Sequence, residues 1–277
     1  FSSCKRLESI TLPDSVTSIG EYAFSGCKSL KSIKLPDSMT EIGDGLFYNC
    51  ESLKSIKLPD GITEIGESTF YNCSNLESVT FPNSLKYIGK EAFFKCTSLR
   101  NIILPDNLGY IGSNAFELCY KLETISFPDS LGGIGSYAFS ECRNLKSINL
   151  PKGLNGLDKY AFSGCINLEK VTLSDSITKI NTSVFEGCTN LKDIVFPEGI
   201  TSIGSRAFQG CNLSDITLRG EITSIGSSAF AGCHNVKSVT LPDCVINIGS
   251  SAFAGCTKLE SITIPRGITD IKMDVFY

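Results

Sequence analysis

Hydrophobic and polar residues recur along this chain in one unit that is repeated from end to end. Within a unit, Ile33 and Leu35 alternate with polar neighbours, the period of two expected for a short strand with one buried side. Pro36 then ends the strand because it has no amide hydrogen to donate to a neighbour. Met39 and Ile42 follow as a second inward-facing pair. Each unit is therefore predicted to form one coil around a hydrophobic interior.

The second half of the unit is predicted to turn sharply before the next coil begins. Gly43 permits a change of direction, and Asp44 or its equivalents can cap a single helical or 3₁₀ turn. That turn carries Leu46 and Phe47 inward, and Cys50 closes the coil. We therefore expect short strands to alternate with short helical turns.

The period is fixed by columns of identical residues. Twelve of the thirteen cysteines recur at one constant interval, except that the eleventh of them comes one position early: Cys4, Cys27, Cys50, Cys73, Cys96, Cys119, Cys142, Cys165, Cys188, Cys211, Cys233 and Cys256. A phenylalanine precedes each cysteine by three positions, and all ten prolines share one column, interrupted by Ser174 and Arg219. This spacing predicts a repeat solenoid of about twelve coils of roughly 23 residues each, forming a single domain over 1–277. The short interval places a single deletion after Cys211.

One charged column supports stacking of the coils in register. The position after the core leucine alternates in sign from Lys54 to Lys192, through Glu77, Arg100 and Glu123. Residues in one column of stacked parallel strands are neighbours, so opposite charges there are predicted to form cross-strand ion pairs. Each exposed pair contributes only about 0 to 1 kcal/mol, so the pattern indicates register more than stability.

The repeated pattern resembles a known family. Leu-x-x-Ile-x-Leu-Pro-x-x-hydrophobic-x-x-Ile-Gly-x-x-Ala-Phe-x-Gly-Cys is nearly intact at residues 7–27 and 236–256, and it resembles the BspA-like, or Treponema pallidum type, leucine-rich repeat. The resemblance implies a curved right-handed solenoid from a family of bacterial and protozoan surface proteins, often adhesins. Asp158, Asn181 and Lys272 depart from the glycine column. The family supplies no universal binding residues to transfer.

Composition narrows the classes of partner. The formal net charge is −4 and no basic stripe is present, which argues against nucleic acid. No apolar run approaches the length of about 18 residues that a membrane-spanning helix needs, so no membrane insertion is expected in this region. The chain begins and ends in mid-repeat, which suggests a piece of a longer protein whose capping repeats lie elsewhere, and uncapped ends would permit end-to-end self-association. The expected location is extracellular or on the cell surface.

The cysteine column allows three interpretations. Side chains in such a ladder behave as small core hydrophobes, which favours free buried thiols. Disulfides between adjacent coils and a metal site stay as alternatives, although no short-spaced ligand pair is present. Cys244 lies outside the column, in a turn position that holds serine or glycine in most other coils, as at Ser15, Ser38, Gly61, Ser130 and Gly267. It is the candidate reactive thiol.

Enzymatic chemistry is not indicated. His234 is the only histidine, and no nucleophile or acid is fixed beside it by the repeat. Residues 133–138 match a dinucleotide-binding fingerprint, but the long helix that this motif needs is not predicted after them. The acidic turn column offers one carboxylate per coil, too few for a calcium site. We therefore expect no catalytic residues, no metal and no cofactor.

Aromatic residues that the repeat does not require are the candidate binding residues. Tyr48, Tyr71 and Phe94 follow the core phenylalanine in three consecutive coils and are expected to stack. Two further pairs share columns, Tyr87 with Tyr110 and Tyr137 with Tyr160. These residues predict a docking patch for a protein or glycan on another cell or in the matrix. The alternative is aromatic packing that shields the coil edges, in a structural spacer without a specific ligand.

Overall fold

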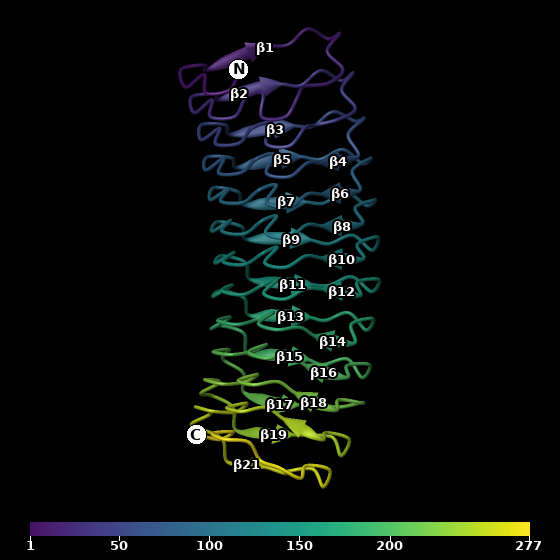
Figure 1. Ribbon diagram of the computed structural model, residues 1–277, viewed down its shortest axis with the longest axis vertical. Coiled ribbons are helices and arrows are strands. Elements are labelled where there is room, and N and C mark those ends of the chain that lie inside the picture. The colour runs from purple at the N-terminus through teal and green to yellow at the C-terminus, as the bar shows by residue number, and fades with distance from the viewer.

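The computed structural model describes residues 1–277 as a stack of parallel coils, with the two chain ends at opposite ends of the stack (Figure 1). Each coil contributes one short strand to a line that follows the array. These strands are β1 (Ser9–Thr11), β2 (Ser32–Lys34), β3 (Ser55–Lys57), β5 (Ser78–Thr80), β7 (Asn101–Ile103), β9 (Thr124–Ser126), β11 (Ser147–Asn149), β13 (Lys170–Thr172), β15 (Asp193–Val195), β17 (Asp215–Thr217), β19 (Ser238–Thr240) and β21 (Ser261–Ile262). The predicted repeat solenoid is confirmed.

A second line of strands lies beside the first and was not predicted from the sequence (Figure 1). Its members are very short: β4 (Glu64–Ile65), β6 (Tyr87–Ile88), β8 (Tyr110–Ile111), β10 (Gly133–Ile134), β12 (Gly156–Leu157), β14 (Lys179–Ile180), β16 (Ser202–Ile203), β18 (Ser224–Ile225) and β20 (Asn247–Ile248). Each consists of the residue before the glycine column, an isoleucine except for Leu157, and the residue ahead of it. One buried residue per strand gives no alternation of hydrophobic and polar positions, so these strands could not be predicted from the sequence pattern.

Strand register follows the sequence period. Ser9 pairs with Ser32, exactly one period further along the chain, and this offset recurs along the array. Across the short repeat, Ser202 of β16 pairs with Ser224 of β18, an offset that is smaller by one position. The predicted deletion is therefore absorbed in the loop without disturbing the second strand line, whereas β15 and β17 of the first line are not paired across it.

The interior is a ladder of stacked phenylalanines. From Phe1 to Phe276 the ring centroids of adjacent coils lie 5.0 to 5.9 Å apart, with planes inclined by 1° to 18°. The leucine, isoleucine and alanine columns surround these rings in one continuous core of 76 buried residues. Met39 and Ile42 are buried, as their spacing predicted.

The predicted helical turns are wrong. The segment around Leu46 and Phe47 consists of successive hydrogen-bonded turns in which Gly45 and Asn49 are left-handed, with φ of 57° and 58°. Alternating handedness points the amides of residues 45, 47 and 49 along the array, where they donate to Glu67, Thr69 and Tyr71 carbonyl oxygens at 2.8 Å. A helix would direct these amides back along its own axis. The turns therefore form a third inter-coil ladder.

The cysteine column links the coils by thiol hydrogen bonds. Eleven cysteines from Cys27 to Cys256 each donate Sγ–H to the phenylalanine carbonyl of the preceding coil, at Sγ–O distances of 3.1 to 3.4 Å. All thirteen cysteines are free. Burial raises the pKa of Cys50 to about 12 and of Cys256 to about 11, which keeps these thiols protonated as donors. The prediction of free buried thiols is confirmed for eleven of the twelve column cysteines, since Cys4 is exposed, whereas the role of these thiols as donors was missed.

Candidate functional site

The three aromatic residues Tyr48, Tyr71 and Phe94, here called the aromatic strip, lie side by side on the outside of the turns. The Tyr48 and Tyr71 ring centroids are 4.6 Å apart with planes inclined by 10°. Those of Tyr71 and Phe94 are 4.7 Å apart at 18°. The structure therefore brings together all three residues that the spacing predicted to stack.

The orientation of the strip decides what it presents to a partner. Because the rings stack on one another along successive coils, each covers its neighbour's face and turns an edge outward. All three residues are half-buried, and neither tyrosine hydroxyl is a buried atom left without a hydrogen-bond partner. Ring edges and phenol groups offer hydrogen bonds and a slightly positive rim, whereas a sugar ring that stacks needs an uncovered aromatic face. The strip is thus suited to polar contacts along its edges.

Tyr22 extends the strip by one coil and was missed in the sequence. Its ring centroid lies 6.2 Å from that of Tyr48, with planes inclined by 58°. The ring leans over Gly45, where an added Cβ would come within 2.1 Å of Tyr22 Cε1. Tyr22 and Gly45 stand one repeat apart in the same sequence column. The sequence therefore offered a sign that the Tyr22 ring has room to lie over the next coil.

The other two predicted pairs also stack, on different parts of the surface. Tyr87 of β6 and Tyr110 of β8 lie on the second strand line, 5.6 Å apart with planes at 5°. Tyr137 and Tyr160 lie in the turns, 4.5 Å apart at 4°, and both are left-handed, with φ of 59° and 61°. Only the latter pair shares the turn surface with the strip.

Carboxylates follow the strip. Glu117 takes the position after Phe94 in the same column, and Asn114 donates a hydrogen bond to it. Burial raises the pKa of the Glu117 carboxyl, and the nearby charges of Glu91 and Glu141 raise it further. Burial and the Tyr48 phenol likewise raise the pKa of Tyr71, with smaller contributions from Glu91 and Glu117. The turn surface therefore passes from aromatic to acidic within one coil.

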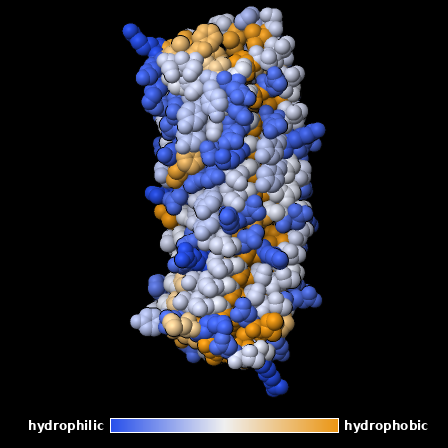
Figure 2. Space-filling model, viewed as in Figure 1, coloured by the Kyte–Doolittle hydropathy of each residue, from blue (hydrophilic) through white to orange (hydrophobic).

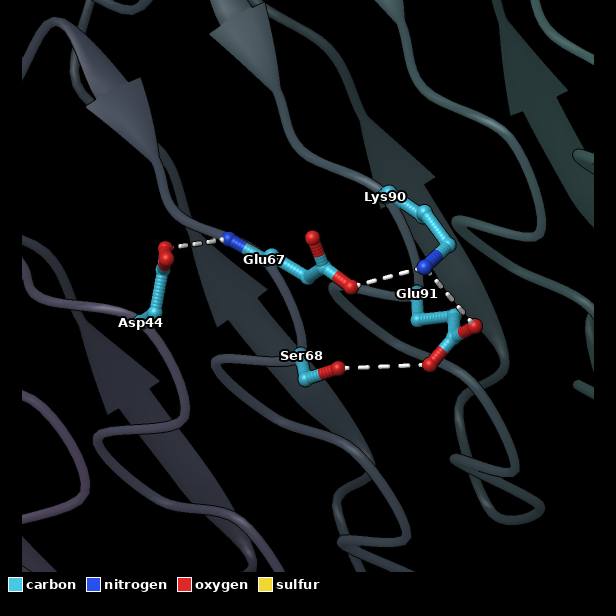
Figure 3. A network of polar contacts seen from close by, with 5 residues as sticks. All are labelled: Asp44, Glu67, Ser68, Lys90 and Glu91. Carbon is cyan, nitrogen blue, oxygen red and sulfur yellow. Dashed lines mark hydrogen bonds and ion pairs between the residues drawn. The ribbon is translucent and has the colours of Figure 1, made fainter.

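A polar network braces the coils that carry the strip (Figure 3). The backbone amide of Glu67 donates to Asp44 at 2.7 Å, and Lys90 pairs with Glu67 at 2.8 Å and with Glu91 at 3.6 Å. Ser68 donates to Glu91 at 3.3 Å. Each link except Lys90–Glu91 joins residues of adjacent coils. The strip therefore rests on a surface held by side chains as well as by backbone.

Ion pairs in the charged column are fewer than the alternation predicted. Lys31 pairs with Glu8 at 2.8 Å and Arg100 with Glu123 at 3.2 Å, but Lys54 forms no ion pair. The side chains of both pairs are 41 to 65% exposed, so water competes with each contact. The column confirms the register and contributes little to stability.

The outward side of the first strand line is flat and mostly hydroxylic, with two apolar exceptions. Ile103 and Val195 are 83% and 81% exposed. A groove of about 540 Å³ runs past Val195 between β13 and β15, lined by mixed charges including Lys170 and Asp193. Figure 2 shows one side of the array, where polar and intermediate side chains predominate and hydrophobic atoms form a narrow line along the long axis. No large apolar anchor gathers here.

The two residues considered for chemistry are held as structural donors. Cys244 is exposed, and its thiol lies 3.3 and 3.2 Å from the carbonyl oxygens of Gly220 and Ile222. The Ser38 hydroxyl donates in the same way to two carbonyl oxygens of the coil that precedes it, those of Asp14 and Val16. Cys244 therefore substitutes for a serine hydroxyl. His234 Nδ1 lies 2.8 Å from the Gly255 carbonyl oxygen. No three His, Cys, Asp or Glu side chains are grouped to hold a metal ion.

The structure has no helix that could cross a lipid bilayer. Comparison with the curated proteins found no match. Solved structures share the architecture, and three of them are compared with this chain. A leucine-rich repeat protein from Bacteroides ovatus ATCC 8483 is 34% identical, with a TM-score of 0.84, over 95% of this chain and 76% of that one.

The other two structures are more distant. A leucine-rich cell surface protein from Faecalibacterium prausnitzii A2-165 is 30% identical, with a TM-score of 0.55, over 94% of this chain and 73% of that one. The pneumococcal vaccine antigen PcpA is 23% identical over 88% and 74% of the two chains, with a TM-score of 0.55, and shows the fold alone. The family model for the BspA type leucine-rich repeat region matches residues 1–123, 63–191, 109–237 and 223–277. The chain belongs to the BspA-type leucine-rich repeat family.

Proposed function

We propose that this chain is a non-enzymatic interaction module, an adhesin-like solenoid that acts at the cell surface and binds a protein or glycan on another cell or in the matrix. Leucine-rich repeat solenoids of this type are typical of interaction and surface proteins, and one 30% identical relative is described as a cell surface protein. The interior is filled by its own side chains. Binding would therefore use the outer surface.

The aromatic strip carries this proposal. Its rings are not required by the repeat, since the same column holds serine or alanine in other coils, as at Ser25 and Ala254. The Tyr71 phenol is near enough to the Glu117 carboxylate for that charge to contribute to its raised pKa, after burial, Tyr48 and Glu91. Tyrosine is enriched where interfaces need a rigid, amphipathic contact.

A structural spacer is the second candidate, and ring geometry is the observation that favours it. Stacked rings 4.6 to 4.7 Å apart already bury one another's faces. Such pairs are worth about 0.5 to 1.5 kcal/mol each. If packing alone explains the strip, its outward hydroxyls have no role.

Replacing the two hydroxyls separates these functions. The double variant Tyr48→Phe/Tyr71→Phe keeps the stack and removes the outward donors. We expect it to bind cultured epithelial cells and immobilised matrix glycans and proteins about tenfold more weakly than the wild type, the ratio that corresponds to loss of about 1.4 kcal/mol. Flow cytometry and surface plasmon resonance would measure binding, and thermal unfolding should be unchanged.

The matched control is Tyr137→Phe/Tyr160→Phe, which alters a stacked pair on the same turn surface. This control should bind as the wild type does. Equal binding by both double variants would show that the strip hydroxyls do not contact a partner. Absence of binding by the wild-type protein to every surface would favour the spacer.

A further inference from the structure

A depression lies at the shortened repeat, lined by polar and charged residues whose aliphatic carbons form most of its accessible wall. Six residues from four coils line most of it: Lys192, Asn212, Ser214, Asn235, Lys237 and Lys258. Its volume is about 350 Å³, and no hydrophobic side chain lines it. It lies in the second half of the array, whereas the aromatic strip lies in the first.

The missing residue accounts for the hollow. In the flanking coils, Thr189 and His234 follow the cysteine, and each donates its amide at 2.9 Å to the glycine two positions earlier, closing a tight turn. The short coil has no residue that corresponds to Thr189 or His234. Asn212, the counterpart of Asn190 and Asn235, comes directly after Cys211, and this turn is absent. The surface between Thr189 and His234 therefore lacks one residue's bulk. The second strand line keeps its register across the deletion, from β16 to β18, whereas β15 and β17 of the first line, which flank the deletion, are not paired.

A directional chain of hydrogen bonds ends in the depression. Lys258 Nζ donates to Asn235 Oδ1 at 2.6 Å, and Asn235 Nδ2 donates to Asn212 Oδ1. An ammonium can only donate, so it fixes the orientation of both amides. The Nδ2 group of Asn212 is left without a protein acceptor. The next pair, Asn190 with Asn167, forms a separate link, so the amide column is broken at the deletion.

Charge at this place departs from the rest of the column. Lys192 and Lys237 flank Ser214, where the preceding coils alternate lysine or arginine with glutamate. None of the three lysines in the depression forms an ion pair. Asp193 is the one carboxylate in the lining. Three ammonium groups, one carboxylate and an unpaired amide therefore make a site that favours an anionic acceptor.

We infer that the depression at the shortened repeat binds a carboxylate or sulfate group of an acidic polysaccharide. This inference rests on the proposed function as an interaction module and names one class of partner. Asn212 Nδ2 would donate to the anion, and the Lys258–Asn235 chain polarises that donor. Lys192 and Lys237 supply positive charge on either side of it. A protein partner would need apolar or aromatic anchors at its centre, and the depression offers none.

Calorimetric titration with oligosaccharides of equal length tests the inference. The probes are a polyuronate, a sulfated oligosaccharide, a neutral glucan and inorganic sulfate alone. The wild type should bind one or both acidic oligosaccharides, not the neutral one, and bind free sulfate at least about tenfold more weakly. The uronate and sulfate arms identify the group. Affinity should fall as ionic strength rises, because salt screens exposed lysines.

Three variants address the site. Insertion of one threonine between Cys211 and Asn212 restores the regular repeat interval, fills the depression and should abolish binding. Lys192→Ala/Lys237→Ala should weaken binding about tenfold, whereas Lys54→Ala/Lys146→Ala, in the same column of regular repeats, should not. Asn212→Asp replaces the donor with a charged acceptor and should weaken binding more than Asn167→Asp.

Several outcomes would overturn the inference. The insertion variant would bind the acidic oligosaccharides as the wild type does, or the two double lysine variants would lose the same affinity. Alternatively, inorganic sulfate would bind as tightly as the oligosaccharides, or no acidic probe would bind. None of these bears on the strip, because the Tyr48→Phe/Tyr71→Phe comparison on cells and matrix is made separately. Conversely, the oligosaccharide result can hold even if that double variant binds normally.

Discussion

Phe116→Ala is expected to lower the free energy of unfolding by about 3 to 5 kcal/mol, the cost of truncating a fully buried phenylalanine. Phe116 has no exposed surface and stacks on Phe93 at 5.0 Å and on Phe139 at 5.2 Å. Its removal leaves a cavity in the middle of the array and breaks the ladder there. No side chain of another column can enter that space without leaving its own.

Urea unfolding followed by circular dichroism would measure the loss. Each coil contacts its neighbours, so a weak central coil is also expected to split one transition into two. Phe276→Ala is the matched control, because Phe276 is 42% exposed and stacks on one ring only, at 5.9 Å. Equal losses from the two variants would show that the ladder is not the main source of cohesion.

Gly226→Ala is the second large effect that we expect. An added Cβ would lie 2.4 Å from Ser205 N and 2.6 Å from Gly204 C, both backbone atoms of the preceding coil. Neither atom can move without separating the coils. Overpacking of this kind costs about 1 to 3 kcal/mol, and more where backbone must shift.

Gly20→Ala is the control, because Gly20 occupies the same column and has no atom within 4 Å of an added Cβ. Thermal and urea unfolding of the two variants should therefore differ clearly. If Gly226→Ala has the same unfolding transitions as the wild type, the coils do not approach one another as closely at this column as the structure shows.

Asn181, a natural departure from the glycine column, supports that expectation, whereas Asp158 keeps the regular backbone bond to the Ile134 carbonyl oxygen at 3.0 Å. Asp158 and Asn181 stand in this column, and the second strand line is interrupted between β12 and β14, just before these two residues. Asn181 Nδ2 donates to the Leu157 carbonyl oxygen at 2.7 Å. In the regular coils a backbone amide makes this bond, as Gly204 does to Ile180. At Asn181 the side-chain amide thus replaces the backbone amide as the donor to the preceding coil, at a position where a Cβ separates the coils.

The constant repeat period made most of the fold predictable. Residues one period apart become neighbours in a stack, so columns of phenylalanine, cysteine and leucine reveal both register and core. The left-handed turns were not predictable, because Tyr137, Glu91 and Arg206 adopt positive φ without being glycine. The inter-coil hydrogen bonds of those turns determine that conformation, and they form only after stacking.

The candidate site was predicted in part. Column spacing placed Tyr48, Tyr71 and Phe94 in one stack, and the rings do stack. Which part of each ring faces solvent depends on side-chain torsions that spacing does not encode. The deletion after Cys211 was visible in the sequence. The depression and the direction of the amide hydrogen bonds at Asn212 could be found only in the three-dimensional structure.

The regular columns are structural and inert, which leaves function to the positions that break the repeat. A thiol titration with Ellman's reagent before and after unfolding tests this directly. The prediction is that the two exposed cysteines, Cys4 and Cys244, react in the native protein, and that the eleven buried ones react only in denaturant, giving thirteen in all. Fewer than thirteen thiols after unfolding without reductant would reveal disulfides. Rapid native reaction of the eleven buried cysteines would show that the column is open to solvent, and either result would contradict a structural, inert column.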